Sequence, residues 1–178
     1  MSYRKNVFMV FFASTLTLIV IALSGCFTSP DSAPPDPSRK VDLGIKVATN
    51  ESMSVKFDRT SNGQYFFECA YSYSAPKTAA GISALLLRID NGNPITLKGS
   101  AVDPARQIGY NLVKRAELVQ FLVSKDQANQ LLNCNSSMTL EFVTQTKIDC
   151  NNLSYTVTQY RSVITQIKAF INHWNNKS

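Results

Sequence analysis

Residues 64 to 74, which read QYFFECAYSYS, carry the strongest secondary-structure signal in this chain. Every second position from Tyr65 to Tyr73 is aromatic, except for Cys69 in the middle. Because side chains alternate across a strand, these five side chains fall on one face. We therefore predict a strand whose aromatic face belongs to the core, with Glu68 on the opposite, solvated side.

Similar alternating or short apolar segments recur on both sides of this strand. The sequence Asp90-Asn91-Gly92-Asn93 supplies a hairpin turn between two of them. The pattern predicts further strands near residues 43–47, 53–57, 82–89, 94–97, 118–123, 139–144 and 153–160. We therefore expect the folded domain to be mainly β.

Two segments have helical patterns instead. Ser124 and Gln127 have capping-box spacing and predict a short helix near 124–133. Apolar residues repeat at helical spacing between Val163 and Trp174, with His173 on the polar side, which predicts a C-terminal amphipathic helix near 161–174. We expect an α+β fold: an antiparallel β-sandwich or curved sheet, with the last helix packed on one face. A helix that binds a partner is the alternative interpretation of this last segment.

The N-terminus has the three-part build of a secretory signal. Basic residues Arg4 and Lys5 precede an apolar run over 7–23, and the sequence Leu23-Ser24-Gly25-Cys26 follows. This last motif closely resembles the lipobox of bacterial lipoproteins. The resemblance implies that residues 1–25 are cleaved, that the Cys26 thiol is acylated, and that the new amino terminus is acylated too. Several acyl chains on one residue anchor a protein stably in a bilayer.

Two other interpretations of the N-terminus remain open. The apolar run has 17 residues, close to the length of a spanning helix, so an uncleaved membrane helix is one alternative. A plain signal peptide with a chance cysteine is the other. If the lipobox operates, Phe27 in place of an aspartate implies sorting to the outer membrane, where the protein would face the periplasm.

The mature chain divides into a tether and one domain. Prolines 30, 34, 35 and 37 predict an extended tether over residues 26–40. Residues 41–178 then form a single periplasmic globular domain. Without the signal the chain has 16 basic and 12 acidic residues, a net charge of +4. These charges are scattered, and nucleic-acid binding would need a clustered basic face, so we expect no nucleic-acid partner.

Cysteines outside the lipobox number three, which is an odd count for an oxidising compartment. Cys69 shares its face with four aromatic residues and is expected to be a buried core thiol. Cys134 and Cys150 lie near the two ends of a predicted strand, and we favour a disulfide between them over the other two pairings. Such a bridge would contribute roughly 3 kcal/mol on the chain-entropy model.

Motifs for catalysis are not found. His173 is the only histidine, and a serine or cysteine hydrolase needs a histidine base. No cluster of Asp, Glu or His has metal-ligand spacing, and the glycines form no phosphate-binding loop. Paired carboxylates remain open, because sequence spacing alone does not bring two acids together. We expect no enzyme, no metal and no cofactor.

Three functions fit such a lipoprotein. The first is an immunity protein that binds and neutralises a secreted antibacterial toxin, for example a phospholipase delivered by type VI secretion. The second is an accessory lipoprotein of envelope assembly or secretion, of pilotin or scaffold type. The third is a binder of a lipid or small apolar ligand through the aromatic face of residues 65–73.

Met53 follows the tether and is a candidate internal start. Translation from Met53 would give a cytosolic form without signal or lipid. A core methionine in phase with Val55 and Phe57 is the alternative interpretation.

Overall fold

The computed structural model describes residues 36–108, 114–156 and 163–177. The chain divides into two units, Met1–Pro35 and Asp36–Ser178, of which the second holds the described residues. The predicted signal peptide and Cys26 lie outside the described residues. The second unit begins with an exposed turn in which the Asp36 carboxylate accepts hydrogen bonds from Ser38. This unit contains every strand and helix described below, together with the whole described core.

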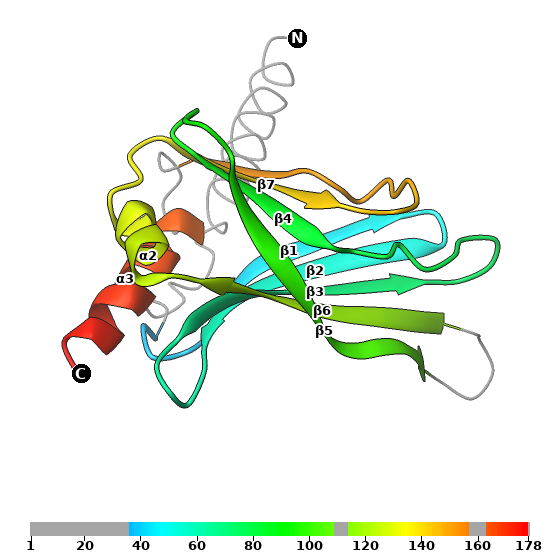
Figure 1. Cartoon of the computed structure of the whole chain (residues 1–178), viewed down its shortest axis with the longest axis horizontal. Coiled ribbons are helices and arrows are strands. Elements are labelled where there is room, and N and C mark those ends of the chain that lie inside the picture. Colours follow the sequence, from blue (N-terminus) through cyan, green and yellow to red (C-terminus); the bar gives the residue numbers. More distant parts are fainter. Residues whose placement is uncertain (1–35, 109–113, 157–162, 178) are drawn as a thin grey trace, which may run out of the picture. The chain divides into compact units, whose positions relative to one another are not determined.

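Eight antiparallel strands form one curled sheet with the order β1-β2-β3-β6-β5-β4-β7-β8 (Figure 1). The strands are β1 (Val41–Ala48), β2 (Glu51–Arg59), β3 (Tyr65–Tyr73), β4 (Ala84–Ile89), β5 (Ile95–Ile108), β6 (Lys114–Val123), β7 (Ser137–Val143) and β8 (Leu153–Thr156). The expectation of a mainly β fold built on a curved antiparallel sheet is confirmed. The predicted hairpin turn at residues 90–93 joins β4 to β5.

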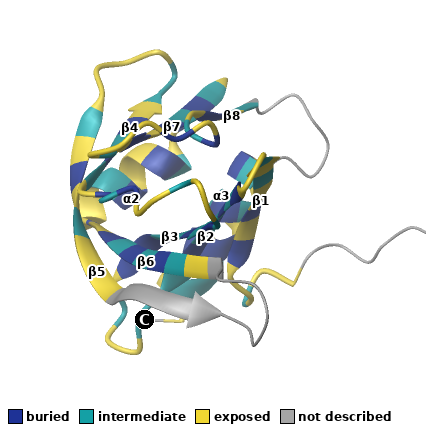
Figure 2. Ribbon diagram, turned by 90° about the vertical axis from the view of Figure 1, so that its right-hand side faces the viewer, coloured by how far each residue is buried: buried dark blue, intermediate teal, exposed yellow. Residues whose placement is uncertain are grey.

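Strand β5 bends the sheet into a half-barrel. Its first residues pair with β4, whereas the residues from Gly99 onward pair with β6. A Cβ atom on Gly99 would lie 2.8 Å from Val119 Cγ1 and 3.0 Å from the carbonyl oxygen of Ser83. Only glycine, which lacks a Cβ atom, lets β5, β6 and the residue that precedes β4 approach so closely at this corner. The two halves of the sheet therefore face each other across the core (Figure 2).

The inner side of the curled sheet is the hydrophobic core. The predicted face of β3 is buried as expected, with Phe67, Cys69 and Tyr71 fully inaccessible. Phe57 of β2 contacts Phe67 with a centroid distance of 4.9 Å. On the outer side Glu68 is half-buried and accepts a hydrogen bond of 3.0 Å from Gln120 Nε2.

Two helices close one end of the half-barrel, here called the helix end (Figure 1). Helix α2 (Lys125–Leu132) begins with the predicted capping box of Ser124 and Gln127. Helix α3 (Val163–Asn175) buries an apolar stripe of Ile164, Ile167, Phe170 and Ile171. Phe170 meets Phe57 edge to face at 5.8 Å, so α3 packs on the inner side of the sheet. Residues 161 and 162 of the predicted helix lie outside the described residues.

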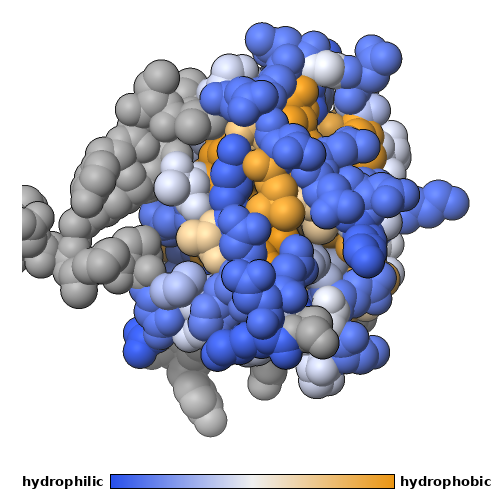
Figure 3. Space-filling view, turned by 90° about the vertical axis from the view of Figure 1, so that its left-hand side faces the viewer, coloured by the Kyte–Doolittle hydropathy of each residue, from blue (hydrophilic) through white to orange (hydrophobic). Residues whose placement is uncertain are grey.

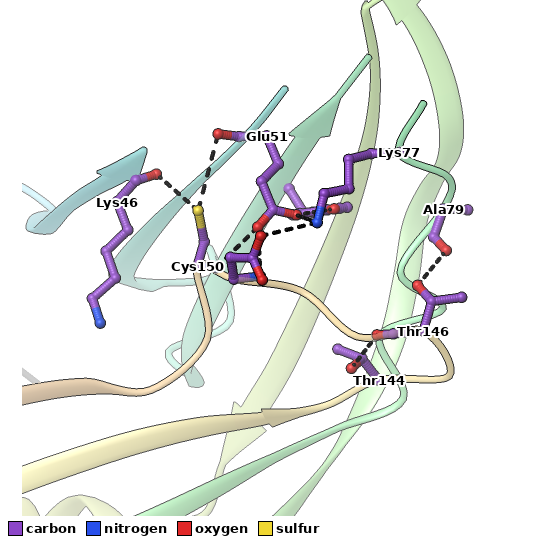
Figure 4. Close-up of polar contacts among 9 residues, drawn as sticks. Lys46, Glu51, Lys77, Ala79, Thr144, Thr146 and Cys150 are labelled. Carbon is purple, nitrogen blue, oxygen red and sulfur yellow. Dashed lines mark hydrogen bonds and ion pairs between the residues drawn. The ribbon is translucent and has the colours of Figure 1, made fainter. Parts of the chain in front are cut away.

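Two long connections close the opposite end, here called the loop end. They are the β3–β4 loop (residues 74–83) and the β7–β8 loop (residues 144–152). The backbone amides of Gln145 and Thr146 both donate to the carbonyl oxygen of Ala80. Thr146 Oγ1 also donates to the carbonyl oxygen of Ala79 at 2.9 Å (Figure 4). These contacts hold the two loops side by side.

Candidate functional site

A buried carboxylate organises the loop end. Glu51 at the start of β2 is only 4% exposed. It accepts a 2.6 Å hydrogen bond from the Tyr71 hydroxyl and further bonds from the backbone amides of Asp149 and Cys150. Lys77 lies 3.8 Å from Glu51 Oε2 and 3.0 Å from Asp149 Oδ2 (Figure 4). We call this set of contacts the Glu51 clamp.

The Glu51 clamp ties together four parts of the chain: the first hairpin, β3, the β3–β4 loop and the β7–β8 loop. Burial and the hydrogen bond to Glu51 raise the pKa of Tyr71 well above its ordinary value. The hydrogen bond to Asp149 raises the pKa of Lys77. Tyr71 therefore stays protonated and Lys77 stays charged at neutral pH. A buried carboxylate needs such partners, because an unpaired buried charge is strongly destabilising.

A second buried carboxylate, Glu117, holds the β3–β4 loop in the same way. Glu117 of β6 is 8% exposed and accepts a hydrogen bond of 3.1 Å from the backbone amide of Gly81. The amide of Ile82 approaches the same carboxylate at 3.5 Å. Both Glu51 and Glu117 thus use their oxygens on backbone amides of the loops. We interpret them as structural anchors of the loop end.

The predicted disulfide is wrong. Cys69, Cys134 and Cys150 are free thiols in the described part of the chain. The Cys134 sulfur lies 3.3 Å from the carbonyl oxygen of Ser137, whereas the Cys150 sulfur lies 3.5 Å from that of Lys46. Strand β7 runs between the two cysteines, and seven extended residues span roughly 20 Å. A disulfide needs Cα atoms within about 7 Å.

The cysteines are poorly suited to nucleophilic chemistry. Burial raises the pKa of the Cys69 thiol well above its ordinary value. Burial, together with Asp90, raises the pKa of Cys134, and burial together with Glu51 raises that of Cys150. The reactive form is the thiolate, and all three environments disfavour it.

His173 lies at the helix end, in the last turn of α3. Its ring meets the Trp174 ring edge to face at 5.3 Å. No hydroxyl or thiol among the described residues forms a hydrogen bond with the Nε2 atom of His173. Within the same residues, no group of three His, Cys, Asp or Glu side chains has the arrangement of a metal site.

The outer side of the loop end carries an exposed apolar pair. Ile45 and Val47 are spaced two and four residues after the buried Leu43, where strict alternation would bury them, but they are 72% and 77% exposed. The pairing of β1 with β2 shifts between Asp42 and Ile45, and Gly44 within the shift has a φ of 101°. This bulge reverses the alternation, so both β-branched side chains point to the outside.

The neighbours of this pair on β2, β3 and β6 are small or apolar. Strand register places two rows beside each other, Ile45-Ser54-Ala70-Leu118 and Val47-Ser52-Ser72-Ala116. Neither row contains a charged side chain. A surface depression of about 430 Å³ lies over one end of these rows. We call it the β1 groove; Ile45, Val47, Ala48, Asn50, Glu51, Ser52, Ser72, Tyr73 and Ser74 line it.

The strand beneath the β1 groove is held in place, because the Glu51 carboxylate accepts hydrogen bonds from the backbone of the β7–β8 loop. The Lys46 ammonium group adds a second link by donating to the carbonyl oxygens of Asn151 and Asn152. Sequence reasoning did not identify this site. One signal existed for Glu51, which is in phase with the buried Met53 and Val55 and so falls on the inner face.

Met53 is fully buried on the inner side of β2 and pairs with Tyr71 of β3. A chain that starts at Met53 would lack β1 and Glu51, and hence both the β1 groove and the Glu51 clamp. The internal start stays a prediction, and the buried position matches the alternative interpretation of Met53 as a core residue.

No family model, curated protein or solved structure matches this chain. None of the helices in the described residues has the length and apolar character that crossing a membrane requires.

Proposed function

We propose that this chain is a lipid-anchored periplasmic lipoprotein, held by Cys26 at the outer membrane, that acts by binding another protein. The best-supported form of the proposal is an immunity protein that neutralises a secreted antibacterial toxin, such as a type VI phospholipase. Blocking a toxin requires a complementary surface and no catalytic group. The tether of residues 26–40 would hold this surface near the membrane where such a toxin acts.

The β1 groove is the observation that carries the protein-binding proposal. It combines the most exposed large apolar side chains of the described residues, Ile45 and Val47, with mostly small, uncharged neighbours beside the buried Glu51 and Tyr73. Buried carboxylate contacts fix it from below, so little ordering is needed when a partner docks. Burial of exposed apolar side chains is the main driving force for such association.

A pull-down from the source strain tests this proposal. The folded unit, residues 36–178, is immobilised and the bound proteins are identified by mass spectrometry. We expect a toxin-like hydrolase to be recovered by the native unit and lost with an Ile45→Asp/Val47→Asp variant. Val143→Asp is the matched control, because Val143 is an exposed apolar residue of β7 outside the β1 groove.

The identity of the proteins recovered in the pull-down distinguishes the candidate functions. Recovery of secretion or outer-membrane assembly components would favour the accessory-lipoprotein function instead. A toxin that binds the double variant as well as the native unit would exclude the β1 groove as its docking site. The remaining alternative, an apolar ligand on the aromatic face of β3, is not favoured by the structure. The rings of that face pack on one another and on α3 as core.

The lipid anchor is tested separately. We expect labelled palmitate to be incorporated into the native full-length chain and not into a Cys26→Ala variant, which should also keep its signal peptide. Labelling of the variant would exclude Cys26 as the acylated residue. A cytosolic form that starts at Met53 would appear as a short, unlabelled species.

A further inference from the structure

A second cavity, distinct from the β1 groove, lies at the helix end of the domain. It has a volume of about 630 Å³, within the range of about 300–1,000 Å³ typical of small-ligand sites. Three distant segments meet around it: the β2–β3 turn, the start of α2 and the end of α3. Figure 3 shows the face that carries the two helices, which is largely hydrophilic around a narrow apolar strip.

Four of the ten residues that line this cavity carry carboxamide side chains, and all four are exposed. Asn62 and Gln64 come from the turn, Asn129 from α2 and Asn175 from the end of α3. We call the site the amide cavity. Lys125 is the one charged residue in its lining, and no carboxylate contributes. The lining also includes the buried residues Tyr65, Val123 and Ala128.

Hydrogen bonds fix the backbone segments that carry these carboxamides. The β2–β3 turn is closed by hydrogen bonds from the Thr60 amide to the Gln64 carbonyl and from the Gln64 amide to Thr60 Oγ1. The Tyr65 hydroxyl lies 3.1 Å from Asn175 Oδ1, to which it donates. The same hydroxyl lies 3.3 Å from the carbonyl oxygen of Ile171, so Tyr65 contacts two positions of α3. A backbone fixed in advance in this way reduces the entropy lost on binding to the ordering of the exposed side chains.

The chemistry of the lining selects the class of ligand. Each carboxamide offers an acceptor oxygen and two donor hydrogens, which complement hydroxyl and acetamido groups. An apolar ligand would leave these groups unpaired, at a cost of about 1–3 kcal/mol each. A multiply charged anion would meet a single cation, and the capping box of Ser124 and Gln127 already uses donors at the start of α2.

We propose that the amide cavity binds an uncharged saccharide of two to three units. The carboxamides would bond its hydroxyl or acetamido groups. Extended peptides are usually recognised by pairing with a strand edge or by an apolar groove, and neither feature occurs in this lining. The proposal is independent of lipidation and of a toxin partner.

An NMR titration tests the saccharide site. The probes are N,N′,N″-triacetylchitotriose and maltotriose, added separately to the ¹⁵N-labelled unit of residues 36–178. With at least one of them we expect saturable shifts confined to the amides of residues 62–65, 123–129 and 175. Asn129→Leu and Gln64→Leu should each weaken that binding by about tenfold, as the loss of one hydrogen-bonding group implies.

Asn172→Leu is the matched control, because Asn172 is an exposed residue of α3 outside the cavity lining. It should leave the affinity unchanged. Shifts with neither saccharide, shifts centred elsewhere, or equal binding by Asn129→Leu would each overturn the proposal. Shifts at the cavity with tetra-alanine amide alone would also overturn it and would indicate a peptide ligand.

Discussion

Single carboxylates join parts of this chain that are far apart in sequence. Asp90, in the turn after β4, accepts hydrogen bonds from three successive backbone amides, those of Asn135, Ser136 and Ser137. The turn between β4 and β5 is thereby fixed to the connection between α2 and β7. These hydrogen bonds favour the ionised carboxylate, so the pKa of Asp90 lies well below its ordinary value.

The lowered pKa of Asp90 predicts a loss of stability in acid. As pH falls below about 4, the unfolded chain takes up this proton before the folded chain does, so folding stability declines. We expect Asp90→Asn to be less stable than the native domain at pH 7, with a difference that shrinks towards pH 2. Urea unfolding at several pH values measures this. Asp42→Asn, at an exposed position of β1, is the control; a pH-independent difference would contradict the assignment.

Thiol chemistry gives a second prediction for individual residues. The unit of residues 36–178, purified without reductant, should contain three thiols when unfolded in guanidinium and titrated with Ellman's reagent. The folded domain should react slowly, because burial keeps the thiols protonated and covered. Detection of only one thiol after unfolding would instead show a disulfide.

Among the secondary-structure elements, β5 has the largest effect on the shape of the fold. It pairs with β4 at its start and with β6 along its remainder, and its register with β6 shifts near Ala101 and Asp103. Bulges of this kind increase the local bend of a strand. The amide of Gly99 donates to the Ser83 carbonyl oxygen at 2.8 Å, which fixes the corner where pairing changes.

Gly99→Ala should destabilise the domain. The added methyl group would lie 2.8 Å from Val119 Cγ1 and 3.0 Å from a ring atom of Phe121, closer than side-chain carbons normally approach. Overpacking of this kind typically costs about 1–3 kcal/mol. The measurement is the midpoint of urea unfolding, with Ser100→Ala, at the exposed neighbouring position, as the control. Equal midpoints for the two variants would show that the corner tolerates a side chain.

The integrity of the domain as a unit depends on β1, although β1 lies at an edge of the sheet. Val41 and Leu43 contribute buried side chains, and Lys46 bonds to the β7–β8 loop from the other edge. Helix α3 contacts both β1 and β8, the two outermost strands. Loss of β1 would therefore expose the core and release the loop end.

A chain that starts at Met53 should consequently fail to fold stably. We expect residues 53–178 to show no cooperative urea transition and to be degraded rapidly by proteases. Residues 36–178 serve as the reference and should unfold cooperatively. Cooperative unfolding of the shorter chain would remove the structural objection to a cytosolic form.

Local patterns in the sequence predicted much of this structure correctly. The alternation over residues 65–73, the capping box of Ser124 and Gln127 and the hairpin turn at 90–93 all depend on residues a few positions apart. Such signals persist in the fold because backbone geometry, and not the partner across the core, sets their period. The curved antiparallel sheet followed from the sum of these signals.

The outer face of β1, the free cysteines and the two sites required the three-dimensional structure. Glu51 bonds to the amide of Asp149, 98 positions further along the chain, and the carboxamides of the amide cavity come from three separate segments. Cys134 and Cys150 are close in sequence but lie beyond opposite ends of an extended strand. Contacts of this range depend on strand order and register, which local periodicity does not encode.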